Sequence, residues 1–211
     1  MMDLEQFIEK TPYLYHLTSQ GNASNIIARR RLFSANQLIM LSGDDTIQNV
    51  KREKRQNHLQ LIVDGVAISL RDQQPISPVA LPKCLTDGWE IGDFLYHLNE
   101  RVFMWPTLKR LWSHFGRYEN ERPVIFRFAT REMLTANPHA KYCRLNSGAT
   151  RANSHLGGKP PERGPNTFQT AADFNLPISQ VAEVTFEGEC TISGPFSVSD
   201  RPDGVFHAIV V

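Results

Sequence analysis

A histidine and a threonine stand two positions apart near the start of the chain, as His16 and Thr18. They belong to the stretch 13–18, Tyr-Leu-Tyr-His-Leu-Thr, whose alternating side chains are typical of a strand. Because alternate residues of a strand point to the same face, the imidazole and the hydroxyl should lie side by side. Such a pair can bind a ligand together. The simpler interpretation is a partly buried histidine that is hydrogen-bonded to a neighbour.

A carboxylate near the other end of the chain, Glu183, is the second candidate for chemistry. Its context, Val-Ala-Glu-Val-Thr-Phe at 181–186, predicts a strand in which Val181, Glu183 and Thr185 share one face. The carboxylate is then either an exposed strand residue or a group directed into a cleft. In a cleft it can stabilise a developing cation or accept a proton.

The polar run 46–61 is locally basic, although the chain carries a formal net charge of only +1. It contains Lys51, Arg52 and Arg55. The ordinary interpretation of such a run is the solvated face of a helix. The functional alternative is a face that follows nucleic-acid phosphates, because cationic side chains supply most non-specific affinity for nucleic acid.

A long segment rich in Gly, Pro, Asn and Arg, residues 146–174, interrupts the pattern of helices and strands. A structureless loop of that length is uncommon inside a compact domain and is usually functional or disordered. It opens with an Asn146-Ser147-Gly148 corner, which we expect to be ordered. Three cations follow, and we expect them to face nucleic-acid phosphates: Arg151, Lys159 and Arg163.

Composition favours one globular domain over residues 1–211, with 41% hydrophobic and 21% charged residues. The three cysteines are spaced too widely for a metal knuckle or a disulfide framework, so we expect reduced thiols in a cytoplasmic protein. No apolar run approaches the roughly 18 residues that cross a bilayer, and the acidic N-terminus is not a signal peptide. The chain has no His-Glu-x-x-His motif and no Gly-rich phosphate loop, so no metal is expected.

The order of the expected elements is α+β and not a βαβ repeat. Helices are expected over 3–9, after Thr18, from Ser34, and over 89–98, 107–118 and 130–136. Strands are expected over 13–18, 66–70, 102–105, 124–128 and 142–145, in a hairpin of 181–186 and 189–192 turning at Gly188, and over 205–211.

The opening of the chain resembles the DarT-like branch of the ADP-ribosyltransferase superfamily. That opening has Tyr-His-x-Thr, a helix and Gly-Leu-Leu-Ser; here Tyr15-His16-Leu17-Thr18 is followed by a helix and Arg31-Leu32-Phe33-Ser34, with Arg31 in place of the glycine. The stretches 98–106 and 146–150 look like an uncharacterised bacterial family of similar size. The resemblance implies an ADP-ribosyltransferase-like central β-sheet core with flanking helices and a long Gly/Pro/Arg-rich loop.

This resemblance also implies an activity, with NAD as a substrate and no metal. His16 and Thr18, with Tyr15, Asn146 and Ser147, would hold the nucleotide. Glu183 would be the catalytic carboxylate. Arg101 is the preferred partner of the pyrophosphate, with Arg110 and Arg151 as rivals. The acceptor would be nucleic acid, although protein acceptors stay open, and the protein could be a toxin, a phage-defence factor or a housekeeping enzyme.

Two other classes of function fit the same residues. An N-glycosidase that excises a base from nucleic acid needs the same carboxylate, with water as the acceptor and without NAD. A non-catalytic nucleotide or nucleic-acid binding module would bind a ligand without turnover, and Glu183 would then be dispensable. No membrane partner is expected, and the oligomeric state is left open.

Overall fold

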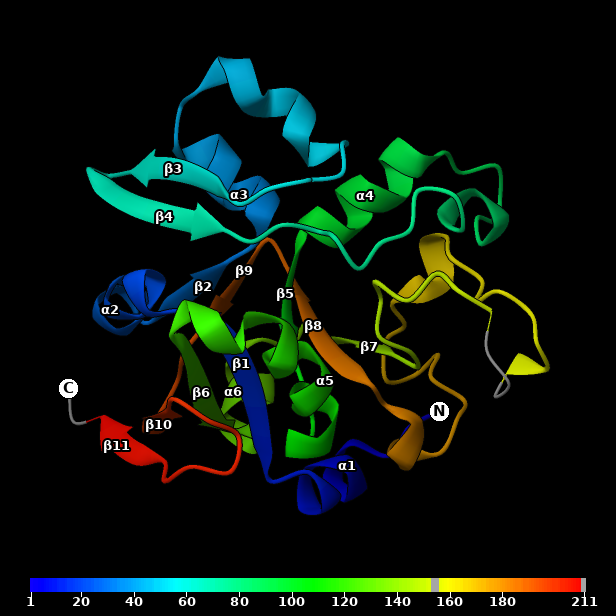
Figure 1. Ribbon diagram of the computed structural model, residues 1–211. Coiled ribbons are helices and arrows are strands. Elements are labelled where there is room, and N and C mark those ends of the chain that lie inside the picture. Colours follow the sequence, from blue (N-terminus) through cyan, green and yellow to red (C-terminus); the bar gives the residue numbers. More distant parts are fainter. Residues whose placement is uncertain (153–155, 210–211) are drawn as a thin grey trace.

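The computed structural model describes residues 1–152 and 156–209, which form a mixed α/β fold with several antiparallel sheets (Figure 1). The helices are α1 (Leu4–Lys10), α2 (Gln20–Arg29), α3 (Ala35–Leu41), α4 (Ile91–Asn99), α5 (Leu108–Tyr118) and α6 (Thr130–Ala136), with 3-10 turns η1 (Asp45–Lys51), η2 (Leu81–Lys83), η3 (Glu119–Glu121), η5 (Pro165–Thr167) and η6 (Ile178–Gln180). The strands are β1 (Tyr13–Ser19), β2 (Arg31–Phe33), β3 (Leu59–Val63), β4 (Val66–Leu70), β5 (Arg101–Met104), β6 (Pro123–Ala129), β7 (Lys141–Cys143), β8 (Glu183–Glu187), β9 (Glu189–Thr191), β10 (Phe196–Ser199) and β11 (His207–Ile209).

Two sheets carry the residues of interest, in the orders β1-β6-β10-β11 and β5-β8-β7. They are joined where the chain beyond β5 meets β1. There the Tyr15 amide donates to the Trp105 carbonyl at 3.0 Å, and the Trp105 amide donates to the Tyr15 carbonyl at 2.8 Å. This junction brings the N-terminal strand beside a sheet whose central strand, β8, comes from the last third of the chain.

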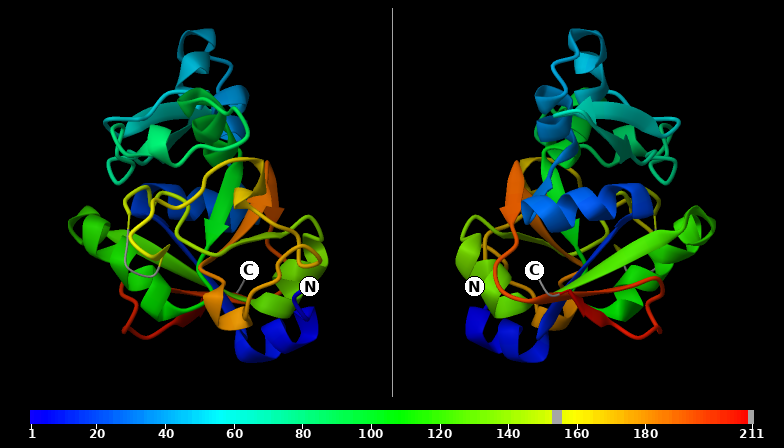
Figure 2. Two further views of the ribbon diagram at one scale, coloured as in Figure 1. Left: turned by 90° about the vertical axis from the view of Figure 1, so that its right-hand side faces the viewer. Right: turned by 90° about the vertical axis from the view of Figure 1, so that its left-hand side faces the viewer.

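The largest hydrophobic core is shared by these two sheets, with Leu14, Phe126, Phe128, Val184 and Phe186 among its members. A separate core lies beneath the β3-β4 hairpin and includes side chains from α3. In Figure 1 this smaller layer of α3, β3 and β4 sits above the two larger sheets, and both side views in Figure 2 agree. The protein therefore has two packed layers that can border a cleft.

The hairpin expected at Gly188 is wrong. β8 pairs with β5 on one edge and with β7 on the other, so it has no free edge for β9. The chain turns at Gly188, which has a φ of 70°, and β9 pairs instead with β2. The turn thus carries the chain from one sheet to another.

The polar run 46–61 does not form one helix. It begins inside η1, continues without regular structure, and ends in β3, which pairs with β4. The terminal strand expected over 205–211 is observed as His207–Ile209, and residues 210 and 211 lie outside the described residues.

Candidate functional site

A cleft of about 670 Å³ opens between the two layers. Its walls come from β1, α2, β2, α3, the end of β4 and the segment after it, the end of α4, β5, α5, the segment 146–152 and the first residue of β8. Elements far apart in the sequence therefore meet here. His16, Thr18 and Glu183 all line this cleft, together with Asn146 and Ser147.

Glu183 is buried, with only 5% of its surface exposed, so the interpretation as a solvated strand residue is wrong. The backbone amide of Ser147 donates a hydrogen bond to its Oε2 at 2.9 Å. Burial raises the pKa of Glu183 to about 7, although the Ser147 hydrogen bonds and the charges of Arg163 and Arg110 act to lower it. A carboxyl group that titrates near neutral pH can exchange a proton with a ligand in either direction.

Arg163 organises the turn that contacts Glu183. Its side chain is buried and donates to the Ala149 carbonyl at 3.2 Å through Nε and at 2.9 Å through Nη2. Nη2 also donates to the Asn146 carbonyl at 2.9 Å. The prediction that Arg163 contacts nucleic acid is therefore corrected, because its donors are used inside the protein to hold the corner that starts at Asn146.

His16 is held as a neutral imidazole. Its Nδ1 lies 2.9 Å from the carbonyl oxygen of Phe103, and burial lowers its pKa to about 4. A neutral ring that donates from Nδ1 leaves Nε2 as its acceptor. Thr18, on the same strand face, adds a hydroxyl to the cleft. The pair can therefore accept a hydrogen bond from a polar ligand and donate one to it.

Tyr15 points the other way, which corrects its assignment to the nucleotide site. It packs in a cluster with Trp105, Leu111 and Phe115, and its ring lies 5.9 Å from that of Phe206. The alternation of strand β1 is the cause, because it sends Tyr15 to the face opposite His16.

Arg101 borders the cleft, but the structure does not bring its guanidinium to Glu183. Its Nη2 lies 3.1 Å from Glu187, and its guanidinium carbon lies 4.5 Å from the centre of the Phe168 ring. Arg101 is paired in register with Glu187, four residues along β8 from Glu183, which is roughly 13 Å of strand. Of its rivals, Arg110 donates to the Ser179 carbonyl at 3.4 Å, and Arg151 is exposed at the cleft.

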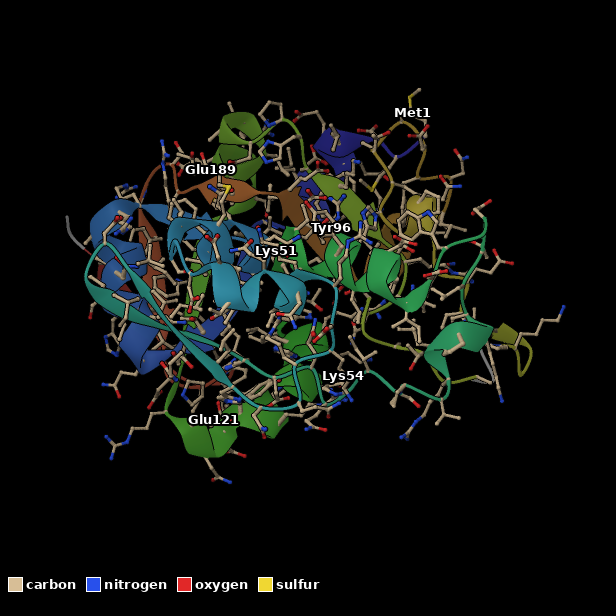
Figure 3. All side chains as sticks on the ribbon, turned by 90° about the horizontal axis from the view of Figure 1, so that it is seen from above. Met1, Lys51, Lys54, Tyr96, Glu121 and Glu189 are labelled. Atoms are coloured by element: carbon tan, nitrogen blue, oxygen red, sulfur yellow. The ribbon has the colours of Figure 1, made fainter. Side chains whose placement is uncertain are left out.

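Two of the basic residues at 51–55 are engaged in contacts within the protein. Arg52 pairs with Asp93 at 2.7 Å, and Arg55 donates to the side chain of Asn99 at 2.8 Å and to the carbonyl of Arg71 at 3.0 Å. The prediction that Arg55 contacts nucleic acid is corrected, because its guanidinium donates these hydrogen bonds inside the protein. Figure 3 shows the protein from above, with Lys51 labelled at the end of η1 and Lys54 labelled on the segment that follows η1.

Sequence reasoning missed an arginine in the cleft wall, Arg71, whose guanidinium nitrogens are buried. Its guanidinium carbon lies 4.1 Å from the centre of the Tyr118 ring, and its Nε lies 3.7 Å from Glu121. Its charge contributes to the lowered pKa values of His16 and His114, after burial itself. His114 and Tyr118 are four residues apart on α5 and therefore share one helix face, but nothing in the sequence pairs that face with Arg71.

The described part of the chain holds no cluster of His, Cys, Asp or Glu side chains arranged to bind a metal ion. Within residues 1–152 and 156–209, no helix is long and apolar enough to span a membrane.

The fold and the cleft define a mixed α/β protein with a pocket that has polar side chains in its walls. Residues 12–192 match the model of DUF7002, a family of unknown function, and the chain belongs to that family. No curated protein and no solved structure matches the chain. The resemblance to ADP-ribosyltransferases thus stays a prediction.

Proposed function

We propose that the protein is an NAD-dependent ADP-ribosyltransferase that modifies nucleic acid in this cleft. One observation carries the proposal: the neutral imidazole of His16 and the buried carboxyl of Glu183 come from opposite ends of the chain and line one cavity. Burial and perturbed pKa values at a shared cavity are typical of functional sites.

The groups in the cleft suit a nicotinamide dinucleotide. A volume of about 670 Å³ lies within the range of small-molecule and cofactor pockets, roughly 300–1,000 Å³. His16 Nε2 can accept from a ribose hydroxyl, and Thr18 can donate to the nicotinamide amide. Asn146 adds a buried side-chain oxygen with no hydrogen-bond partner among the described residues. Such an oxygen is costly unless a ligand supplies a donor.

In the proposed reaction, the bond between ribose C1′ and the nicotinamide nitrogen breaks, and its electron pair neutralises the nicotinamide ring. The ionised Glu183 stabilises the positive charge that develops at C1′. A nucleophilic atom of the acceptor base then forms the new bond to C1′ and releases a proton, which the Glu183 carboxylate accepts. The Ser147 amide, held through Arg163, fixes the carboxylate for both roles.

The N-glycosidase alternative gains support from the pKa of Glu183. At about 7, a substantial fraction of the carboxyl is protonated at neutral pH, and a protonated carboxyl can donate to a departing base. Water would then be the acceptor, and NAD would have no part.

Incubation with NAD labelled in its adenosine half, together with DNA, RNA or protein, tests the proposal. We expect label on nucleic acid, release of nicotinamide in equal amount, and a higher melting temperature with NAD, because ligand binding stabilises the native state. Release of a free base without NAD would support the glycosidase. A shift in melting temperature without turnover on any acceptor would indicate a binding module.

The exposed cations of the 146–174 segment should make nucleic-acid binding dependent on salt. Arg151 and Lys159 are exposed, and we expect replacing both with glutamine to reduce the slope of log affinity against log salt by about 0.7–0.9 for each phosphate that the variant no longer neutralises. Arg52→Gln is the matched control, because Arg52 is already paired with Asp93. Measured binding that is independent of salt, or absent at low salt, would rule out this role.

A further inference from the structure

The outer face of α5 carries an exposed tryptophan among unpaired cations. Trp112 is 39% exposed and is held edge-to-face against Phe115, with ring centres 5.4 Å apart. Lys109 and Arg117 are exposed on the same helix, three residues before and five residues after Trp112. Residues three or four apart in a helix are neighbours, so Lys109 adjoins Trp112 and Ser113, and Arg117 adjoins Ser113. Together these exposed residues form one stripe.

The stripe is continuous with the cleft. Ser113 and Arg117 line it from α5, and Arg151 lines it from the segment 146–152. Gly116 lies within the stripe, and a Cβ atom built at this position would meet no atom within 4 Å. Open space therefore lies within the stripe, close in the helix to Trp112.

Several arginines elsewhere on the protein are already paired. Arg29, Arg31 and Arg131 each pair with a carboxylate, namely Asp64, Glu189 and Glu5. Among the described residues, by contrast, no carboxylate pairs with Lys109 and Arg117 of α5, or with Arg151, which lines the cleft from the segment 146–152.

The acids nearest to α5 in sequence are already engaged. The helix itself, Leu108–Tyr118, contains no acidic residue. Glu119 pairs with Arg201 at 3.0 Å, and Glu121 lies 3.1 Å from His58. The positive charge of the stripe is therefore available to bind an anionic partner. A second copy of this face is a poor partner, because it would bring like charges together.

We propose that the outer face of α5 binds the acceptor as a single-stranded nucleic acid, with an unpaired base stacked on Trp112 and the backbone phosphates held by Lys109 and Arg117. This proposal rests on the proposed function only in taking nucleic acid as the acceptor. Basic grooves with aromatic platforms are the usual means of binding single strands. A duplex fits less well, because its bases are stacked on one another and must be unstacked first.

Binding of fluorescently labelled single-stranded DNA and RNA, measured by anisotropy without NAD, tests the stripe separately from the chemistry. We expect Trp112→Leu to weaken binding about 5- to 150-fold and Trp112→Phe to keep most of it, because stacking is worth about 1–3 kcal/mol per base. Tyr13→Leu is the matched control, since Tyr13 is 41% exposed beneath Arg127 and does not line the cleft. It should leave the affinity unchanged.

A second pair of variants uses the open space at Gly116. Gly116→Glu places a carboxylate in the stripe without a clash and should weaken binding, whereas Gly116→Ala should not. Equal affinity for duplex and single strand, or full affinity in Trp112→Leu and Gly116→Glu variants with unchanged melting temperatures, would overturn the proposal. Loss of NAD turnover with intact single-strand binding would contradict the proposed function alone.

Discussion

Glu183→Gln is expected to lower the rate of ADP-ribosyl transfer roughly 10²–10³-fold or more, the scale seen when one preorganised electrostatic group is removed. Glutamine keeps the size of the side chain and its ability to accept from the Ser147 amide, so the fold and NAD binding should be nearly unchanged. What is lost is the negative charge beside C1′ and the proton acceptor. Single-turnover rates with saturating NAD measure the effect.

Glu9→Gln is the matched control, because Glu9 is an exposed glutamate on α1 and does not line the cleft. Near-full activity of Glu183→Gln would reject the catalytic assignment. Two other carboxylates, Glu100 and Asp173, do not line the cleft. Asp72 does, so it becomes the carboxylate to replace next.

The pH dependence of the rate separates the two proposed chemistries. If Glu183 acts as a carboxylate, kcat/KM rises as pH increases through about 7, where the group ionises. If Glu183 donates a proton to a departing base, kcat/KM falls over the same interval. The Glu183→Gln variant should lose this dependence in either case.

Local patterns predicted the elements that carry the site. The helix predicted over 107–118 is observed as α5, with Thr107 as its N-cap, and β6 encloses the strand predicted at 124–128. The partner of β9 could not be predicted, because pairing at Gly188 depends on which strands already occupy the edges of β8. The short connection at Gly188 favoured a hairpin of β8 and β9, but β5 and β7 already occupy both edges of β8 and exclude it.

In the cleft, too, local patterns predicted some features, whereas others depend on the folded chain. The alternation of β1 was enough to place His16 and Thr18 on one face, and applied strictly it also sends Tyr15 away from them. The arginines were less predictable. Residue type gives a guanidinium its charge, but whether that charge faces solvent, as at Arg151, or backbone carbonyls inside the protein, as at Arg163, depends on the folded chain.

Glu183 should also make the stability of the protein depend on pH. Its pKa is about 7 in the folded protein and near its ordinary value of 4.5 in the unfolded chain. Below pH 4.5 both states hold the proton, and the group has no effect. As pH rises from 4.5 to about 7, the unfolded chain releases a proton that the folded protein retains, so the free energy of unfolding falls by about 3 kcal/mol and then stays level.

Glu183→Gln removes this proton linkage, and we expect the variant to be more stable than the wild type at pH 8 by about 3 kcal/mol, and nearly equal to it at pH 4.5. For a chain of this size, that difference raises the melting temperature by roughly 6–12 °C. Calorimetric melting of both proteins across this range measures it, with Glu9→Gln as the exposed control. A variant no more stable than the wild type at pH 8 would show that the buried carboxyl is better solvated or better paired than its 5% exposure and its contact with Ser147 indicate. A gain in stability coupled to a loss of activity, in contrast, is what a buried acid kept for catalysis predicts, because the folded state bears the cost of a charge that only the reaction needs.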